Sequence, residues 1–476
     1  RESANLFNKC FSEIASNTIK QLDMTNDYTF LSNNIPLSCH SLNLLPVTNS
    51  DILQIILKLK NSKSSGHDDI SNSLLKKVGT IIAEPLAHIV NLSLSNGHFP
   101  TVLKQAIVIP LHKKNDRHVV STYRPISILP SISKIFEHVI NNNLVSFLNK
   151  YEISDPSQHG FTKGKSLDTA LADYISQISQ CMDKNISCLG LFVDFTKTFD
   201  CVSHELLLHK LERYGIRGTA LQWFQSYLSD RTQKVLVNST LSRESTVTIG
   251  VPQGSILGPT LFIIFINDLL KLVKKTSNCT VMSYADDTNF IITGTDVNAI
   301  TRRAQEVFSL VQQWVSKNKL WINNEKLAFT IFTNMTNFQD ITLNLNKTLV
   351  KCSNSIKLLG VVFDNHLKWN LYIDQLCSKL SSVCYALKNV ARQCNYSTVK
   401  QLYFACFQSL LTYGIIHWGH SPDFQRVFIL QKWAIRILAG IKSMHSCRSA
   451  FKQHRILTLP SIYIYEMLCY TYKNIN

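Results

Sequence analysis

The spacing of apolar residues divides the chain into a helical start, a middle in which strands and helices alternate, and a helical end. Residues 1–100 are expected to be mostly helical, with a polar, turn-rich break at 60–71 that ends in Ser71, a candidate helix N-cap. The segment QAIVIPLHKK (105–114) is typical of a short strand that ends in basic residues. The pattern of 121–140 indicates a turn followed by an amphipathic helix.

From about residue 186 the pattern becomes sharper. The run ISCLGLFVDF predicts a strand that closes with Asp194, and Ser203 can cap the helix HELLLHKLERYG, which would stop at Gly215. Residues 245–250 indicate a further strand, and a Gly/Pro turn then leads into the apolar helix PTLFIIFINDLL. The segment SYADDTNFIIT predicts two strands joined by a tight turn that carries two adjacent aspartates.

A long amphipathic helix and an α-rich end complete the pattern. Apolar residues at alternating spacings of three and four predict a helix packed on a sheet: Val297, Ile300, Ala304, Val307, Val311 and Trp314. Short strands are expected at 320–322 and 329–332. Beyond Trp369 the helical spacing returns, first at 373–390 and later in VKQLYFACFQSLLTY and VFILQKWAIRILAG.

Composition adds a basic balance and a core large enough for several subdomains. A chain of 476 residues with 45% hydrophobic content suggests two to four subdomains and argues against general disorder. The net charge of +17 favours a polyanionic partner, with nucleic acid ahead of an anionic membrane. Because the chain begins at Arg1 inside a helical pattern, we expect it to be a piece of a longer reading frame.

The cysteines and the apolar segments exclude some classes of protein. Thirteen cysteines without CxxC pairs are typical of reduced, buried thiols in an intracellular protein. The spacing of Cys447, His454 and Cys469 is too irregular for a zinc knuckle. Polar residues interrupt LYFACFQSLLTYGIIHW, so a buried helix is expected there rather than a membrane span.

The acidic residues at strand ends carry the candidate chemistry. Asp194 closes one strand, and Asp286 and Asp287 lie in the turn of a later hairpin, so only a folded sheet could bring them together. Carboxylates from separate strands are the ligands that a two-metal nucleotidyl-transfer site needs. A lone aspartate at a turn is more often a simple cap, but the Tyr-Ala-Asp-Asp hairpin after a matching Asp strand is far more specific.

Four segments in this order, FVDF, GVPQGSILGPTLF, YADD and INNEKL, resemble the palm motifs of reverse transcriptases. With the segments SSGHDDIS, YRPISILP and FVDFTKTFDCVSH, the chain resembles in particular the reverse transcriptases of non-LTR (LINE-type, jockey-like) retrotransposons. This resemblance implies an α+β, right-hand polymerase with fingers, a palm with an antiparallel sheet, and a helical thumb. The expected segments are an N-terminal helical extension (1–100), fingers (101–190), palm (191–370) and a thumb with the C-terminal region (371–476).

The resemblance also implies roles for individual residues. The expected catalytic residues are Asp194, Asp286 and Asp287, which with Phe195 would hold two Mg²⁺ ions, Mn²⁺ being an alternative. The nucleotide-binding residues would include a ring that excludes a 2′-hydroxyl, an amide and glycine of the GVPQGS turn, and basic groups near the triphosphate or template: Phe199, Gln253, Gly254, Lys326, Arg124 and Lys113. The alternatives without a functional role are a core aromatic for the ring and solvated side chains for the basic groups.

The implied activity is RNA-directed DNA polymerization of element RNA by target-primed reverse transcription, with template RNA, primer DNA and deoxynucleotides as partners and no membrane. The implied location is intracellular, nuclear at the site of integration and cytoplasmic for the RNA–protein particle. KLLGVVFDNHLKW resembles the strand–turn–strand that holds the primer. Departures from the family pattern at Thr162, Leu327 and Tyr372 leave open a catalytically silent nucleic-acid-binding relic, and a maturase-like RNA chaperone is a further alternative.

Overall fold

The computed structural model describes residues 1–20, 28–113, 116–277, 279–294, 296–334, 341–345 and 348–474. The packing of the chain defines two compact units. Unit 1 comprises Arg1–Lys163, Phe192–Asn289 and Gln305–Leu327, and unit 2 comprises Gly164–Leu191, Phe290–Ala304 and Ala328–Asn476. These units follow spatial packing rather than sequence order, and the scheme of four consecutive segments stays a prediction.

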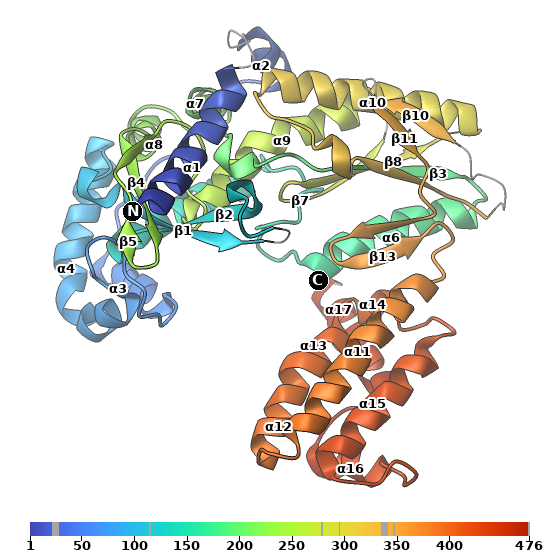
Figure 1. Cartoon of the computed structure of the whole chain (residues 1–476). Helices are drawn as coiled ribbons and strands as arrows, with labels where there is room; N and C mark the ends of the chain where they lie inside the picture. Colours follow the sequence, from blue (N-terminus) through green and yellow to red (C-terminus); the bar gives the residue numbers. More distant parts are fainter. Residues whose placement is uncertain are drawn as a thin grey trace. The chain divides into compact units, whose positions relative to one another are not determined.

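Unit 1 begins with four helices, which confirm the predicted helical start: α1 (Glu2–Lys20), α2 (Tyr28–Asn34), α3 (Asn49–Lys58) and α4 (Asn72–Asn96) (Figure 1). Ser71 caps α4 as predicted, because its hydroxyl accepts a hydrogen bond from the backbone N–H of Leu74 at 3.2 Å. Gly97, with φ of 61°, ends the helix in the left-handed conformation.

A five-stranded sheet in unit 1 has the order β2-β1-β4-β5, with β6 also paired to β4. Its strands are β1 (Gln105–His112), β2 (Tyr123–Ile128), β4 (Arg231–Val237), β5 (Thr240–Leu241) and β6 (Ser245–Val247). The prediction of a turn before the amphipathic helix was wrong, because 123–128 pairs antiparallel with β1. The helix itself is confirmed as α5 (Ser131–Lys150). The predicted strand at 245–250 ends early, since Gly250 has φ of 84° and turns the chain.

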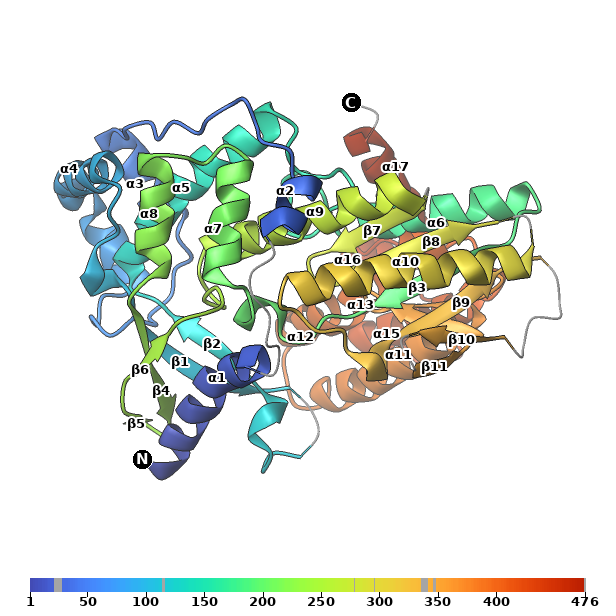
Figure 2. The same ribbon diagram turned by 90° about the horizontal axis from the view of Figure 1, so that it is seen from above.

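Unit 1 also contains three further helices (Figure 2). In the sequence, α7 (His204–Arg213) and α8 (Thr219–Leu228) precede β4, and α9 (Leu257–Ser277) follows β6. Ser203 caps α7 through the N–H of Leu206 at 3.5 Å, and Gly215 follows the helix with φ of 101°, both as predicted. The predicted apolar helix is confirmed as α9, in which Leu261, Phe265 and Leu269 are fully buried.

A four-stranded sheet has the order β7-β8-β3-β9. The strands are β7 (Thr280–Tyr284), β8 (Asp287–Thr293), β3 (Cys188–Val193) and β9 (Ala328–Phe332). They confirm the strand before Asp194, the two strands around the aspartate pair and the strand at 329–332. The predicted strand at 320–322 was wrong, because only Ile322 forms a single bridge, to Phe195.

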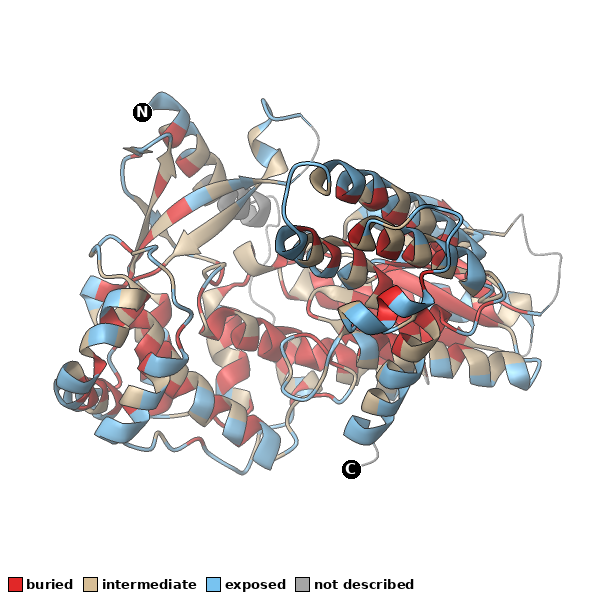
Figure 3. Ribbon diagram, turned by 90° about the horizontal axis from the view of Figure 1, so that it is seen from below, coloured by how far each residue is buried: buried red, intermediate tan, exposed pale blue. Residues whose placement is uncertain are grey.

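The long amphipathic helix is confirmed as α10 (Val297–Lys317). Five of the six predicted core positions are completely buried, and they are Ile300, Ala304, Val307, Val311 and Trp314. Figure 3 shows the same division along many helices, with buried residues on one face and exposed residues on the other. The 3.6-residue period therefore reported the buried face correctly.

Unit 2 contains α6 (Leu167–Asp183), two hairpins and a set of C-terminal helices. The hairpins are β10 (Thr342–Leu345) with β11 (Thr348–Lys351), and β12 (Ser355–Leu358) with β13 (Val361–Asp364), the second being the predicted strand–turn–strand. The predicted helical end is confirmed in the orange to red part of Figure 1. Its helices are α11 (Asn370–Val390), α12 (Tyr396–Leu402), α13 (Ser409–Thr412), α14 (Ile415–Trp418), α15 (Phe424–Ala439), α16 (Arg448–His454) and α17 (Leu459–Asn474).

Two expectations from composition meet the structure with mixed results. All thirteen cysteines are free thiols, but only some are buried, namely Cys188, Cys201, Cys279, Cys384 and Cys447. Within the described segments, α4 is the one helix long and apolar enough to cross a membrane by length and composition. It packs in unit 1, where Trp223 of α8 donates to the hydroxyl of Ser93 at 3.0 Å, and core helices pass the same length test.

Candidate functional site

The three candidate carboxylates of unit 1 come from two neighbouring strands. Asp194 directly follows β3, Asp286 lies in the turn between β7 and β8, and Asp287 is the first residue of β8. Strand β8 is hydrogen-bonded to both β7 and β3. Residues that are remote in the sequence therefore come from adjacent places in one sheet.

Two of these carboxylates, Asp286 and Asp287, have a raised pKa. Burial raises the pKa of Asp287 to about 6, and the negative charges of Asp286 and Asp194 act in the same direction. Burial also raises the pKa of Asp286, and the charge of Asp194 adds to that shift. Such mutual repulsion between partly buried carboxylates is relieved by a bound cation, so it is typical of functional sites.

Lys326 forms an ion pair with this group. It ends a short 3-10 turn (Asn324–Lys326), and its Nζ lies 2.5 Å from Oδ2 of Asp194. The backbone N–H of Asn323 donates to the carbonyl of Asp194 at 2.8 Å, which ties the two segments together. Leu327, the departure from the family pattern, is buried in the core and leaves Lys326 directed toward the carboxylate.

Two further predicted basic residues act on the same group through their charge. Lys113 follows β1 and Arg124 lies in β2, and both side chains are exposed. The charge of Lys113 lowers the pKa of Asp287, and that of Arg124 lowers the pKa of Asp286. Both residues therefore lie within electrostatic range of the acids, and their role toward nucleotide or template stays a prediction.

The capacity of the three aspartates to bind a metal ion depends on how their oxygen atoms are grouped. Within the described part of the chain, no three His, Cys, Asp or Glu side chains are already grouped as a metal site. Phe195 is buried and its ring carries no donor atom, so only its backbone carbonyl could serve as the predicted ligand. The chemistry of the carboxylates suits a hard divalent cation, and the ammonium of Lys326 already balances one of them.

Phe199, the candidate ring beside the sugar, is fixed by neighbouring rings and by its backbone. Its ring centroid lies 4.7 Å from that of Phe262 on α9, and Phe161 meets it edge-on at 6.4 Å. Its carbonyl accepts the N–H of Val251 at 2.8 Å. The backbone of Phe199 is thereby attached to the GVPQGS turn, and the role of the ring toward the sugar stays a prediction.

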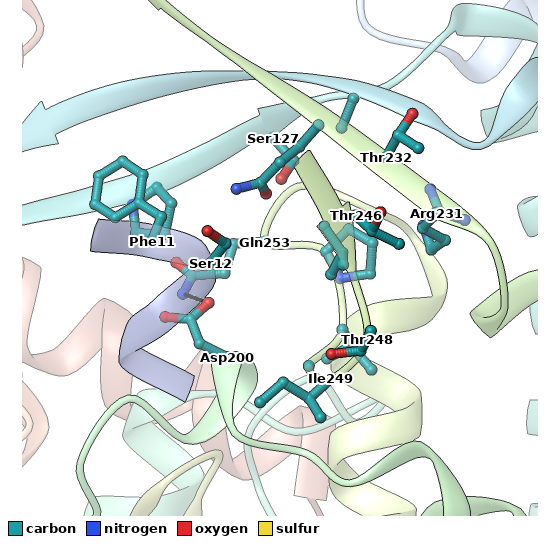
Figure 4. Close-up of a pocket in the computed structure, with 17 residues that line it drawn as sticks. Phe11, Ser12, Ser127, Asp200, Arg231, Thr232, Thr246, Thr248, Ile249 and Gln253 are labelled. Atoms are coloured by element: carbon teal, nitrogen blue, oxygen red, sulfur yellow. Dashed lines mark hydrogen bonds between the residues drawn. The ribbon is translucent and has the colours of Figure 1, made fainter. Parts of the chain in front are cut away.

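The GVPQGS turn lines a small cavity of about 70 Å³ in unit 1. Figure 4 shows Gln253 and Asp200 at this cavity, joined by a hydrogen bond of 2.8 Å from Nε2 of the amide to Oδ1 of the carboxylate. Gly254 has φ of 129°, and a Cβ there would lie 2.3 Å from the carbonyl oxygen of Ser127. A Cβ at Gly250 would lie 2.7 Å from the carbonyl oxygen of Asp200. Glycine at both positions therefore allows this close approach of neighbouring backbone, and the role of Gly254 toward the nucleotide stays a prediction.

A comparison with protein-family models now identifies the chain. The model described as "Reverse transcriptase (RNA-dependent DNA polymerase)" matches residues 111–363, more than half of the chain. The chain belongs to the reverse transcriptase family. The matched range contains every residue predicted for the site, from Lys113 to Lys326.

Relatives of this chain come from mobile elements, and the predicted resemblance to LINE-type, jockey-like reverse transcriptases is confirmed. The chain is 29% identical over 413 residues to the RNA-directed DNA polymerase from mobile element jockey of Drosophila melanogaster, which covers 84% of this chain and 44% of the relative. It is 27% identical over 416 residues to the probable RNA-directed DNA polymerase from transposon BS of the same species, covering 84% and 45%. The chain thus spans less than half the length of these relatives. A solved structure of apo telomerase from Candida tropicalis is similar over 55% of this chain and 54% of its own, with 14% identity and a TM-score of 0.40.

Four polar residues of the candidate site were missed by reasoning from the sequence. Thr198 donates to Asp286 at 3.4 Å, and Asn323 lies beside Asp194. Asp200 accepts from Gln253, and His204 contacts the GVPQGS turn. Three of them lie in FVDFTKTFDCVSH, so the density of polar groups just after Asp194 was the available signal.

Proposed function

We propose that this chain is the polymerase part of an RNA-directed DNA polymerase that adds deoxynucleotides to a DNA primer on an RNA template. One observation carries the proposal: in a chain of the reverse transcriptase family, Asp194, Asp286 and Asp287 come from adjacent strands, and the charge of Asp194 adds to the raised pKa of both Asp286 and Asp287. Phosphoryl transfer requires positioning and charge neutralisation more than covalent help from the protein. A group of carboxylates on a rigid sheet supplies such positioning.

We further propose that Asp194 and Asp286 are the main ligands of two divalent cations, with the carbonyl of Phe195 and the carboxylate of Asp287 as additional oxygen donors. Mg²⁺ is the expected ion, because it prefers hard oxygen ligands. When bound, the two ions would activate the primer 3′-hydroxyl and stabilise the leaving pyrophosphate. The carboxylates would position the ions, and the charge of the ions would oppose the raised pKa of Asp286 and Asp287.

The remaining site residues would act on nucleotide and template. Lys326 would exchange its contact with Asp194 for the triphosphate, and Arg124 and Lys113 would neutralise phosphate charge nearby. Phe199 would lie under the sugar, and Gln253 would face nucleotide or template with its amide. Copying of element RNA from a nicked chromosomal end is the finer proposal, which the mobile-element relatives support.

The three residues that depart from the family pattern fit their surroundings in the structure. The hydroxyl groups of Thr162 and Tyr372 are hydrogen-bonded, and the apolar Leu327 lies in the core. Thr162 donates to the carbonyl of Gly160 at 3.2 Å, and the hydroxyl of Tyr372 donates to the carbonyl of Tyr413 at 3.2 Å within unit 2. Leu327 is buried. A decayed copy is expected to accumulate cavities and unpaired groups at such positions, so these interactions support an active enzyme.

Primer extension on an RNA template with Mg²⁺ tests the proposal. Asp286→Asn should reduce extension at least about 100-fold, because charge stabilisation of the transition state is lost. RNA affinity should stay within a few fold, because binding depends on basic residues elsewhere. Asp183→Asn removes an exposed carboxylate from α6 and should extend like the unmodified protein. Binding of RNA without extension by the unmodified protein would support the relic or the RNA chaperone instead.

A further inference from the structure

The GVPQGS turn is attached by its backbone to the segment that follows Asp194. The N–H of Gly250 donates to the carbonyl of Val202, and the N–H of Val251 donates to the carbonyl of Phe199, both at 2.8 Å. These two bonds fix the beginning of the turn against the 3-10 segment Thr198–Asp200.

Two more contacts fix the turn from other sides. The carbonyl of Gln253 accepts the N–H of Ser127 in β2 at 2.7 Å. Nε2 of His204 lies 2.7 Å from the carbonyl of Gly250, so this nitrogen must carry the proton and donate it. The turn backbone is therefore held by four bonds, none of which involves a carboxylate.

The hydrogen bond from Gln253 to Asp200 is additional to that framework. Burial raises the pKa of Asp200 to about 6, so an ionised carboxylate at this position costs folding free energy. A neutral side chain would close the same space at lower cost. Because the backbone bonds already define the turn, the reason for this carboxylate lies in what it does to the amide of Gln253.

An ionised carboxylate only accepts hydrogen bonds, whereas a glutamine amide has a donating end and an accepting end. With Nε2 bound to Oδ1 of Asp200 at 2.8 Å, the amide cannot turn over without placing two acceptor oxygens against each other. We propose that Asp200 is a positioning residue that fixes the amide of Gln253 in one orientation, so that Oε1 is kept as the acceptor for the nucleotide or template. This inference rests on the proposed polymerase function.

Asp200→Asn is the first test, because asparagine has nearly the same shape but can pair with either end of the glutamine amide. Nucleotide binding is measured in a complex of protein, RNA template and a primer terminated with a dideoxynucleotide, which needs no catalysis. We expect the dissociation constant of the matched deoxynucleotide to rise about fivefold, the size of one hydrogen bond. RNA affinity should be unchanged, and Glu212→Gln, which neutralises an exposed carboxylate on α7, should bind nucleotide normally.

Thermal unfolding separates positioning from folding. The pKa of Asp200 is raised on folding, so stability falls as pH rises from about 4 to about 6, and the penalty is fully present above that range. Asp200→Asn lacks the penalty and should unfold at an equal or higher temperature at pH 8. An unfolded or strongly destabilised variant would show a structural role and overturn the inference.

Reversing the pair provides the decisive test. Gln253→Glu alone places two carboxylates against each other and should weaken nucleotide binding by about tenfold or more. Adding Asp200→Asn places the amide N–H of asparagine opposite the new carboxylate at position 253 and should recover most of that loss in nucleotide affinity. The same Asp200→Asn change alone is expected to weaken nucleotide binding. With Gln253→Met, Asp200→Asn should have no further effect. Equal factors in all three backgrounds would overturn the inference, whereas absence of primer extension by the unmodified protein would instead count against the proposed function.

Discussion

Phe199 illustrates how one side chain can be defined without complete burial. Its ring tilts against Phe262 at 4.7 Å and meets Phe161 edge-on, and its backbone is bonded to Val251. Both the ring and the backbone are therefore fixed. A ring held in this way can exclude an added hydroxyl by steric overlap, which a mobile side chain would allow.

We predict that Phe199→Ala raises the incorporation of ribonucleotides relative to deoxynucleotides by about tenfold, equivalent to about 1.4 kcal/mol of lost steric exclusion. Single-nucleotide insertion with each substrate, on the same primer and RNA template, gives the ratio directly. Tyr385→Ala removes an exposed ring from α11 in unit 2 and should leave the ratio unchanged. Unchanged selectivity in Phe199→Ala would return this residue to an ordinary core aromatic.

Among the helices of unit 1, a fully buried ion pair joins α7, α9 and the C-terminal part of α10. Nζ of Lys210 lies 2.7 Å from Oδ1 of Asp268, and both side chains have no exposed surface. The indole N–H of Trp314 donates to the other oxygen of Asp268 at 2.8 Å, and Lys210 also donates to the carbonyl of Phe265 at 2.6 Å. Burial lowers the pKa of Lys210, while Asp268 acts against that shift.

Removing one partner of this pair should be more harmful than removing both. Asp268→Ala leaves a buried ammonium without its counter-charge and is expected to lower the free energy of unfolding by about 3–5 kcal/mol. Replacing both residues, with Lys210→Met and Asp268→Leu, should cost less, because no uncompensated charge remains. Urea unfolding of the two variants provides the comparison. A double variant less stable than Asp268→Ala would show that the pair itself, rather than its desolvation, dominates.

Long periodic elements could be predicted from the sequence because periodicity reports which face is buried. The stripe of α10 and the helix α11 both follow the expected spacing. Short elements could not be predicted, because pairing with distant segments decides them. Residues 123–128 form a strand because they pair with β1, whereas 320–322 form only one isolated bridge, between Ile322 and Phe195. A lysine such as Lys210 is expected at the surface from the sequence. Its burial is stabilised by the ion pair with Asp268, which lies in another helix.

The same limit applies to the candidate site. The three aspartates could be found because a strand end and a hairpin turn mark them locally. The link between Asp200 and Gln253 could not, since it depends on how the turn at 250–254 docks on the segment after β3. Motifs thus located the three aspartates, and tertiary structure was needed to find the contact between Asp200 and Gln253.

At the scale of the whole molecule, the net charge of +17 has to act through particular surfaces. On α11 of unit 2, the apolar stripe of Ile373, Leu376 and Leu380 is buried. Lys379, Lys388 and Arg392 are exposed and lie on the helix or just after it. These three groups can approach phosphates without any change in the core.

We therefore predict that replacing Lys379, Lys388 and Arg392 together by glutamine weakens binding to an RNA–DNA duplex and flattens its salt dependence. Each phosphate that these side chains no longer neutralise should reduce the slope of log K against log salt by about 0.7–0.9, because fewer counterions are released on binding. Fluorescence anisotropy at several KCl concentrations measures the slope. The matched control replaces Lys58, Lys60 and Lys77, which are exposed in unit 1, by glutamine. This control removes the same total charge from the protein. If both triple variants reduced the slope equally, net charge would act without a preferred surface, and if only the first did, the exposed side of α11 would be part of the duplex-binding face.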